Sequence, residues 1–286
     1  MEHETDWIRL WRELVEVRDR GWQKQMANIG PDVWTTKARD FHAGTLRRWK
    51  TPDSSRDLLA ATLDADPGCT ALDIGAGPGA WAAFLAGHAR SVTAVEPSGA
   101  MIEVMREHLA AEGIANVTIV QGAWPDVSVE PHDYTLCSHA MYACPDLPGF
   151  IRRMIQCTRR VCFLLMRAPT TDGIVAEAAR RVWGHSHDSP NFQVAYNVLL
   201  QMGICPSVLM ENTGLWEPWS SPSLEAALAD LKRRFDLGAH SEHDAFLADL
   251  VRRHLTPEDG RYLWPRGVRS ALVYWDVNRE QERVAT

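Results

Sequence analysis

The sequence predicts an α/β fold in which short apolar strands alternate with helices around a largely parallel sheet. Three observations carry this prediction. Apolar segments of about five residues recur between amphipathic helical segments from about residue 70 to residue 167. The first of them runs into a glycine-rich turn, Gly75-Ala76-Gly77-Pro78-Gly79, and the second ends in an acidic residue, Glu96. Alternation of this length produces βαβ units with right-handed crossovers.

The core elements follow one another without long gaps. Strands are expected at 70–74, 91–95, 117–121, 134–139 and 161–166, and helices at 80–87, 99–112 and 147–158. The last of these strands is apolar throughout, which is typical of a central strand covered on both faces. Ligands of such sheets bind beyond the carboxyl ends of the strands. Four residues are therefore expected along one edge: Asp73, Glu96, Ala123 and His139.

Further elements flank this core on both sides. Helices are expected at 6–27, 32–49 and 53–64 before it, and at 172–183, 191–203, 223–236 and 242–254 after it. Residues 208–211 and 270–277 alternate like strands at the edge of a sheet. We expect four parts: a helical N-terminal lid (1–65), the ligand-binding core (66–213), an insertion that forms a second lid (214–268), and the last core strand with a C-terminal tail (269–286).

The glycine turn and Glu96 together predict a nucleoside-binding half-site. Glycine adopts positive φ and lets a ligand approach the backbone closely. A helix that begins directly after such a turn presents unpaired N–H groups to the ligand. Glu96, at the end of the next strand, is placed to accept hydrogen bonds from ribose hydroxyls.

Two ligand classes fit this half-site. A dinucleotide fits the looser pattern Gly75-x-Gly77-x-x-Ala80, and S-adenosylmethionine (SAM) fits Asp73 followed by Gly75, Gly77 and Gly79. Asp73 favours SAM, because a carboxylate at the lip of the turn would repel a pyrophosphate. The same carboxylate suits a cationic amino group or an ordered water beside a methionine moiety.

With these motifs in order, residues 69–167 resemble the core of the class I SAM-dependent methyltransferase family. The resemblance implies a Rossmann-like sheet of seven strands, whose last two strands form an antiparallel pair interrupted here by the insertion. It also implies SAM as cofactor, S-adenosylhomocysteine (SAH) as product, and methyl transfer by in-line SN2 displacement. Alignment and desolvation should contribute more to such a reaction than a strong acid or base.

The resemblance assigns the cofactor contacts to residues along the sheet edge. They are Asp73, Gly75, Ala76, Gly77, Gly79, Glu96, Pro97, Gly122, Ala123, Trp124, Ser138 and His139. Ala123 is a departure, since relatives often carry an acidic residue there that bonds the adenine amino group. Main-chain groups of Ala123 and Trp124, stacking by Trp124, or the nearby Asp126 are alternatives. Four residues of the N-terminal segment are candidates to hold the methionine part of SAM: Trp34, Lys37, Arg39 and Phe41.

Four residues are candidate catalytic groups: His139, Tyr142, His185 and His187. A histidine suits general-base work because its ordinary pKa lies near neutrality. The alternative for His139 is a hydrogen bond to the cofactor alone, and Tyr142 would line the acceptor pocket. The string His185-Ser186-His187-Asp188 is either a substrate contact or a solvated loop. Its short spacing is not specific for a metal, and none is expected.

Composition limits the remaining functions. A net charge of -7 argues against a nucleic-acid substrate. No apolar segment is long enough to span a membrane, and the N-terminus lacks the features of a signal peptide. Six cysteines without a C-x-x-C pair indicate reduced thiols in the cytoplasm.

The twelve tryptophans, many of them in the two predicted lids, favour an enclosed small-molecule acceptor. We expect the protein to be a monomer or a homodimer. Three alternatives stay open at this point. They are a nicotinamide-dependent oxidoreductase, a methyltransferase directed at protein or RNA, and a SAM-binding regulator without catalysis.

Overall fold

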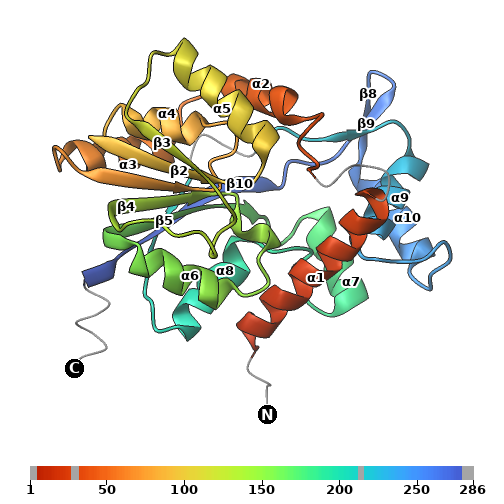
Figure 1. Ribbon diagram of the computed structural model, residues 1–286. Helices are drawn as coiled ribbons and strands as arrows, with labels where there is room; N and C mark the ends of the chain where they lie inside the picture. Colours follow the sequence, from red (N-terminus) through yellow and green to blue (C-terminus); the bar gives the residue numbers. More distant parts are fainter. Residues whose placement is uncertain (1–4, 27–31, 212–215, 279–286) are drawn as a thin grey trace.

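A seven-stranded sheet with helices on both faces forms the centre of the molecule (Figure 1). The computed structural model describes residues 5–26, 32–211 and 216–278. The strand order is β3-β2-β1-β4-β5-β10-β6. The strands are β1 (Thr70–Ile74), β2 (Ser91–Glu96), β3 (Val117–Gln121), β4 (His132–Ser138), β5 (Thr158–Pro169), β6 (Ser207–Met210) and β10 (Val268–Asp276). β1 to β5 are parallel, and β10 is antiparallel to both β5 and β6, which confirms the predicted α/β fold.

The helices agree closely with the sequence periodicity. They are α1 (Trp7–Met26), α2 (Ala38–Arg48), α3 (Ser54–Asp64), α4 (Ala80–Ala86), α5 (Gly99–Ala111), α6 (Leu147–Gln156), α7 (Ile174–Trp183), α8 (Phe192–Gln201), α9 (Leu224–Arg234) and α10 (Asp244–His254). Ser98 caps α5 by accepting a hydrogen bond from the Met101 N–H. α2 is shorter than predicted because residues 33–37 form turns. None of these described helices is both long and apolar enough to cross a membrane.

The prediction that residues 270–277 lie at the edge of the sheet is wrong. β10 lies between β5 and β6 and pairs with β5 over its whole length. Its neighbouring residues Leu272 and Val273 are fully buried in two different hydrophobic clusters, one on each face of the sheet. Helices therefore cover both faces at this position, and of these two strands only β6 is at an edge.

The N-terminal helices pack on opposite faces of the sheet. α1 contributes Trp11 and Leu14 to the cluster that also contains residues of α6 and α8. The Trp11 side chain is fully buried, and its indole N–H donates to the Cys144 carbonyl at 2.8 Å. α3 contributes Leu59 and Leu63 to the cluster on the other face, beside α4 and α5. Both helices are thus part of the core packing.

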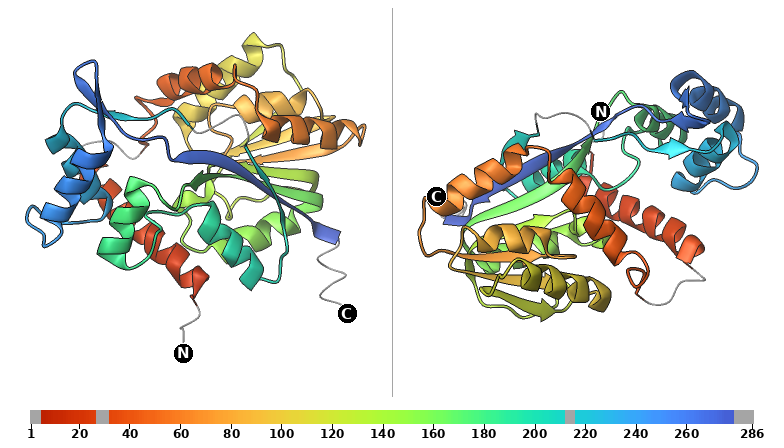
Figure 2. Two further views of the ribbon diagram at one scale, coloured as in Figure 1. Left: turned by 180° about the vertical axis from the view of Figure 1, so that it is seen from behind. Right: turned by 90° about the horizontal axis from the view of Figure 1, so that it is seen from above.

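Residues 220–263 form a separate layer at one end of the sheet (Figure 2). This layer contains α9, α10 and a small sheet of β7 (Ser220–Ser221), β8 (Thr256–Glu258) and β9 (Arg261–Leu263). Phe235 and Trp264 are buried with α7 in a third hydrophobic cluster. The small sheet was not predicted, since strands of two or three residues carry no periodic signal.

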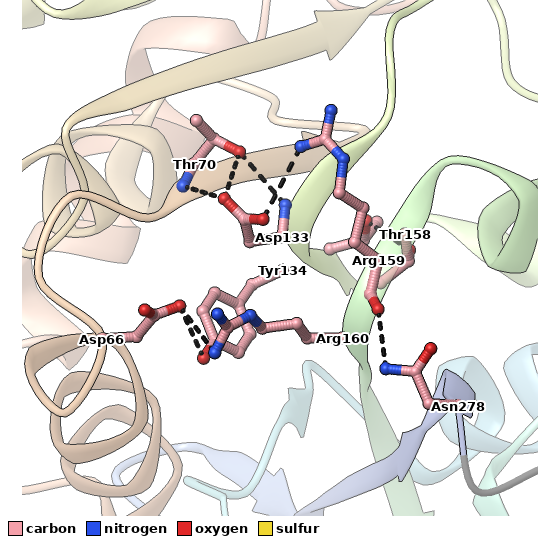
Figure 3. Close-up of polar contacts among 9 residues, drawn as sticks. Asp66, Thr70, Asp133, Tyr134, Thr158, Arg159, Arg160 and Asn278 are labelled. Atoms are coloured by element: carbon pink, nitrogen blue, oxygen red, sulfur yellow. Dashed lines mark hydrogen bonds and ion pairs between the residues drawn. The ribbon is translucent and has the colours of Figure 1, made fainter.

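The amino ends of β1, β4 and β5 form the opposite end of the sheet (Figure 3). A hollow of about 570 Å³ lies there, and its polar groups are paired with one another. Asp133 accepts hydrogen bonds at 2.8 Å from both the backbone N–H and the hydroxyl of Thr70. Arg160 forms an ion pair with Asp66 at 3.1 Å. These matched charges support the base of the sheet, far from the predicted ligand edge.

Candidate functional site

The turn after β1 has the backbone conformation that the sequence predicts. Gly75, Gly77 and Gly79 have φ values of 69°, 55° and 87°. A Cβ at Gly75 would lie 2.2 Å from the Ala140 Cβ, and one at Gly79 would lie 2.4 Å from the Met105 Cγ. A Cβ at Gly77 would meet nothing within 4 Å. Two of the glycines therefore permit close packing, and Gly77 leaves the turn open on the side where a ligand would approach.

The carboxylate of Glu96, at the end of β2, is hydrogen-bonded to the glycine turn that follows β1. Its Oε2 accepts from the Gly77 N–H at 2.8 Å, and its Oε1 accepts from the Ser98 N–H at 2.9 Å. Only 6% of the residue is exposed. Burial raises the pKa of Glu96, and the two N–H groups oppose that rise. Each carboxylate oxygen keeps a further lone pair for a second donor.

Asp73 is the most unusual charged group of the site. It is buried at the end of β1, and its Oδ2 has no hydrogen-bond partner among the described residues. Burial, with a smaller contribution from Glu96, raises the pKa of Asp73 to about 8. The carboxyl group does accept a hydrogen bond from the Ala82 backbone, but a buried Oδ2 without a partner is costly, so its presence points to a ligand that supplies one.

The other predicted cofactor contacts lie along the same edge. Ala76 is buried in the turn, and Pro97 is exposed after β2. Gly122 donates its N–H to the Glu96 carbonyl at 3.2 Å, so the end of β3 is held beside the end of β2. The Trp124 indole N–H donates to the Phe150 carbonyl of α6 at 3.3 Å. The Trp124 ring therefore packs on α6, while Ala123 stays exposed.

His139 and Tyr142 meet directly beyond the end of β4. The Tyr142 oxygen accepts from the Arg167 backbone N–H at 2.6 Å and lies 3.0 Å from His139 Nδ1. The left-handed backbone of His139, with φ of 56°, ends the strand after Ser138. Burial first, then the charges of Arg167 and Arg48, lowers the pKa of His139 to about 4. The imidazole is therefore neutral near pH 7.

Trp216, from the segment after β6, lies against His139. The two ring centroids are 5.5 Å apart in an edge-to-face arrangement. The Trp216 indole N–H donates to the Ser270 hydroxyl at 3.2 Å, and its backbone N–H donates to the Val268 carbonyl at 2.6 Å. These bonds to β10 fix the indole beside the imidazole. Trp216 is still 43% exposed, so it borders the site without filling it.

His185 and His187 lie elsewhere. His187 packs against Trp7 of α1 at 5.9 Å, and His185 packs against Trp183 at 5.8 Å. Among the residues that the structure describes, no contact joins either of them to His139. Asp188, which follows them, is buried and accepts from Arg234 of the insertion at 2.5 Å. In the described ranges, no group of three or more His, Cys, Asp or Glu side chains is placed to bind a metal.

The candidates for the methionine part of SAM lie over α5. Arg39 is committed to Glu107 through two hydrogen bonds of 2.5 and 2.8 Å. Trp34 packs with Phe41 and against the first turns of α5, and Lys37 is exposed. From this segment it is Arg48, at the end of α2, whose charge reaches His139. Arg39 is therefore paired on the exposed surface of α2 and α5, and its expected contact with the cofactor stays a prediction.

Sequence reasoning missed four residues of this edge: Asp32, Arg48, Arg167 and Trp216. Asp32 accepts from the Ser98 hydroxyl at 2.7 Å, next to Glu96. Arg167 had a usable signal, since it is a charged residue at the end of the apolar strand β5, as His139 is after β4. Trp216 is one of the lid tryptophans that pointed in general to an apolar pocket, and nothing in the sequence marks Asp32 or Arg48.

The residues at this edge fit a SAM-type ligand. The open space beside Gly77 would be filled by a Cβ, and the buried Asp73 Oδ2 lacks a partner. Glu96 retains acceptor capacity at the position expected for ribose. A pyrophosphate, by contrast, would face two buried carboxyl groups with no cation at the turn in contact with them among the described residues.

Comparison with known proteins agrees with this geometry. Residues 71–160 match the family model described as a methyltransferase domain. Over 264 residues the chain is 24% identical to an uncharacterized protein of Haemophilus influenzae, covering 88% of this chain and 91% of that protein. The YcgJ protein from Bacillus subtilis shares the fold at 14% identity, covering 77% of this chain and 97% of its own, with a TM-score of 0.50.

A SAM-dependent methyltransferase from Geobacter sulfurreducens, solved in complex with SAH, is 15% identical with a TM-score of 0.46, covering 78% of this chain and 90% of its own. The matched domain contains the glycine turn, Glu96 and His139. The chain therefore carries a methyltransferase domain over residues 71–160, within a fold that the YcgJ protein shares.

Proposed function

We propose that this methyltransferase acts on an enclosed small-molecule acceptor bound beyond the ends of β4 and β5. The observation that carries the proposal is the ring-lined site of His139, Tyr142 and Trp216. Trp216 lies near the start of the insertion, whose helices α9 and α10 pack at this end of the sheet (Figure 2). A site bordered in this way favours a small ligand over a protein or nucleic-acid surface.

The cofactor would be held by the residues of the sheet edge. Asp73 and the turn Gly75–Gly79 would contact its methionine part, and Glu96 its ribose. Pro97 and the main chain of Gly122–Trp124 would contact the adenine, with Ser138 and His139 next to the methionine part. SAM supplies an electrophilic methyl group on a sulfonium, which an acceptor displaces in line. The protein then has to align the acceptor and exclude water.

His139 serves better as a neutral hydrogen-bonding group than as a general base. A base works best with a pKa near the working pH, and burial has lowered the pKa of His139 to about 4. Its Nδ1 is already engaged by the Tyr142 hydroxyl. The pair would therefore orient the acceptor. His185 and His187, which pack against α1 and α7, are assigned no part in the transfer.

Calorimetric titration with SAH, NAD and NADP tests the cofactor, and SAH release with candidate acceptors tests turnover. We expect micromolar binding of SAH and none of either dinucleotide. Dinucleotide binding without SAH binding would overturn the methyltransferase proposal and favour an oxidoreductase. SAH binding with no turnover of any small-molecule, protein or RNA acceptor would instead make it a regulator.

We expect Glu96→Ala to weaken SAH binding by about 1 to 3 kcal/mol, because charge-assisted hydrogen bonds to the ribose are lost. Calorimetry at pH 7.5 gives the affinity. Glu107→Ala is the control, since Glu107 is an exposed carboxylate on α5 that pairs with Arg39. Equal SAH affinity in Glu96→Ala and wild type would show that Glu96 does not bind the ribose.

A further inference from the structure

The hydroxyl of Tyr142 supplies a backbone acceptor that is missing where β4 ends. Along a strand, residues two apart present their backbone groups to the same neighbour. The Leu165 carbonyl of β5 accepts from the His139 N–H at 2.9 Å. Arg167 faces the same side two residues later, but β4 has already ended at Ser138. The Tyr142 oxygen accepts from the Arg167 N–H at 2.6 Å instead, and its own proton is left to be donated elsewhere.

The proton of the Tyr142 hydroxyl reaches one acceptor among the described residues, Nδ1 of His139 at 3.0 Å. Burial raises the pKa of Tyr142 to about 12, so the phenol keeps its proton. The imidazole is neutral near pH 7, so one of its nitrogens accepts and the other carries a proton. If Nδ1 carried that proton, the Tyr142 oxygen would face two donors, and its own buried proton would lack an acceptor. All these groups are satisfied when Tyr142 donates to Nδ1 and the ring proton is on Nε2.

Nε2 of His139 is on the other side of the ring from Nδ1 and therefore faces away from Tyr142. The Trp216 ring, which lies edge-to-face against His139 at 5.5 Å, has no lone pair to offer. The Arg167 guanidinium only donates, and its Nε and Nη2 are bonded to the Pro190 carbonyl at 3.2 and 2.9 Å. His139 is partly exposed. In the described part of the chain, Nε2–H is thus a donor at the edge of the site with no acceptor of its own.

We propose that Tyr142 is a positioning residue that fixes His139 in the Nε2–H tautomer, and that this N–H donates to an oxygen lone pair of a bound ligand. The inference rests on the proposed function and refines it. The oxygen belongs either to the carboxylate of the cofactor or to a carbonyl or carboxylate group of the methyl acceptor. In both cases His139 holds a ligand and takes no proton from it, because Tyr142 occupies Nδ1 and Nε2 already carries a proton.

Long-range ¹H–¹⁵N correlation NMR of protein labelled with ¹⁵N-histidine measures the tautomer without any ligand. The signals of His139 are those that disappear in His139→Gln. At pH 7.5 we expect Nδ1 to resonate as an unprotonated ring nitrogen and Nε2 as a protonated one. An Nδ1–H ring, or an equal mixture of the two tautomers, would overturn the proposal.

Tyr142→Phe removes the donor, and Tyr134→Phe is the matched control. Tyr134 is also buried, but its hydroxyl bonds to Asp66 at 3.2 Å at the other end of the sheet. In Tyr142→Phe the His139 Nδ1 resonance should shift, because the hydrogen bond that it accepts is lost. In Tyr134→Phe it should keep its wild-type position. An unchanged Nδ1 resonance in Tyr142→Phe would show that Tyr142 does not set the tautomer.

The Nε2–H proton of His139 then identifies the ligand that supplies the oxygen. Hydrogen bonding to a carboxylate should shift this proton downfield when SAH is added. Methylthioadenosine, which has the adenosine and thioether but no carboxylate, should leave it in place. If SAH has no effect, benzoate and acetophenone are added to SAH-saturated protein, with toluene as the control that lacks oxygen. The assignment to a ligand oxygen is wrong if neither SAH nor either oxygen-bearing probe shifts the proton.

The failure of this inference is distinguishable from the failure of the proposed function. The tautomer is measured in wild-type protein before any ligand is present, so it does not depend on a folded Tyr142→Phe variant. If His139 is an Nδ1–H ring and the protein binds SAH, the inference fails alone. If the wild-type protein does not bind SAH, the proposed function fails whatever the tautomer.

Discussion

Gly77→Val is expected to abolish SAH binding while the protein stays folded. Gly77 has a left-handed backbone with φ of 55°, and a Cβ there would meet no protein atom within 4 Å. The valine side chain would therefore enter the open space beside the turn and block approach to the backbone. We expect SAH affinity to fall at least about 100-fold, or roughly 2.7 kcal/mol. Calorimetric titration of the purified variant measures the loss.

Gly113→Val controls for the backbone strain. Gly113 also has positive φ, at 67°, and open space around its Cβ position, but it lies in the turn after α5. Both variants should lose about 1 to 3 kcal/mol of folding free energy, since a β-branched residue is strained at positive φ. SAH binding should be lost in Gly77→Val alone. Normal SAH affinity in Gly77→Val would show that the cofactor does not bind at this turn.

The proposed cofactor-binding half of the site is predictable because its residues are close in the sequence. A strand, a tight turn, a helix and a second strand occupy residues 70–96, and each boundary has a local cause. Positive φ requires glycine in the turn, and parallel pairing of β1 with β2 brings the end of β2 beside that turn. Glu96 therefore reaches the Gly77 N–H through local geometry alone.

The proposed acceptor-binding half of the site depends on contacts between distant segments. Arg167 of β5 bonds to Pro190 before α8, and Asp188 bonds to Arg234 of α9, 46 residues later. No periodic pattern specifies such pairs. The same reason explains why the Arg39–Glu107 pair was not predicted: Glu107 is 68 residues away, and only the crossing of α2 over α5 brings the two together.

Asp73→Asn is expected to stabilise the protein at alkaline pH. In the unfolded chain an aspartate has a pKa of about 3.9, whereas burial raises the pKa of Asp73 in the folded state to about 8. The folded protein therefore binds more protons between these two values, and wild-type stability falls as pH rises from about 4 to 8. Asparagine removes this loss. We expect the Tm of the variant to exceed that of wild type by at least about 2 °C at pH 8 and to approach it near pH 4.

Asp133→Asn, at the other end of the sheet, is expected to change stability at alkaline pH in the opposite direction. Burial raises the pKa of Asp133, but the two hydrogen bonds from Thr70 and the nearby arginines outweigh it, so the net pKa is lowered. Its stabilising contribution is present above the unfolded pKa and is lost as the solution becomes more acidic. Asp133→Asn should therefore lower the Tm at pH 8, where Asp73→Asn raises it. Thermal unfolding of both variants from pH 4 to 9 gives the two trends.

The same Asp73 carboxylate ties cofactor binding to pH. If its charged form holds the cationic amino group of the cofactor, binding must ionise it. Wild-type SAH affinity should then rise from pH 6 to 8, with release of up to one proton, which calorimetry in buffers of different ionisation enthalpy detects. Asp73→Asn should bind SAH more weakly at pH 8 and lose this dependence. If Asp73→Asn is more stable than wild type and binds SAH equally well, Asp73 does not contact the ligand. The wild-type carboxyl group would then lower stability without improving binding.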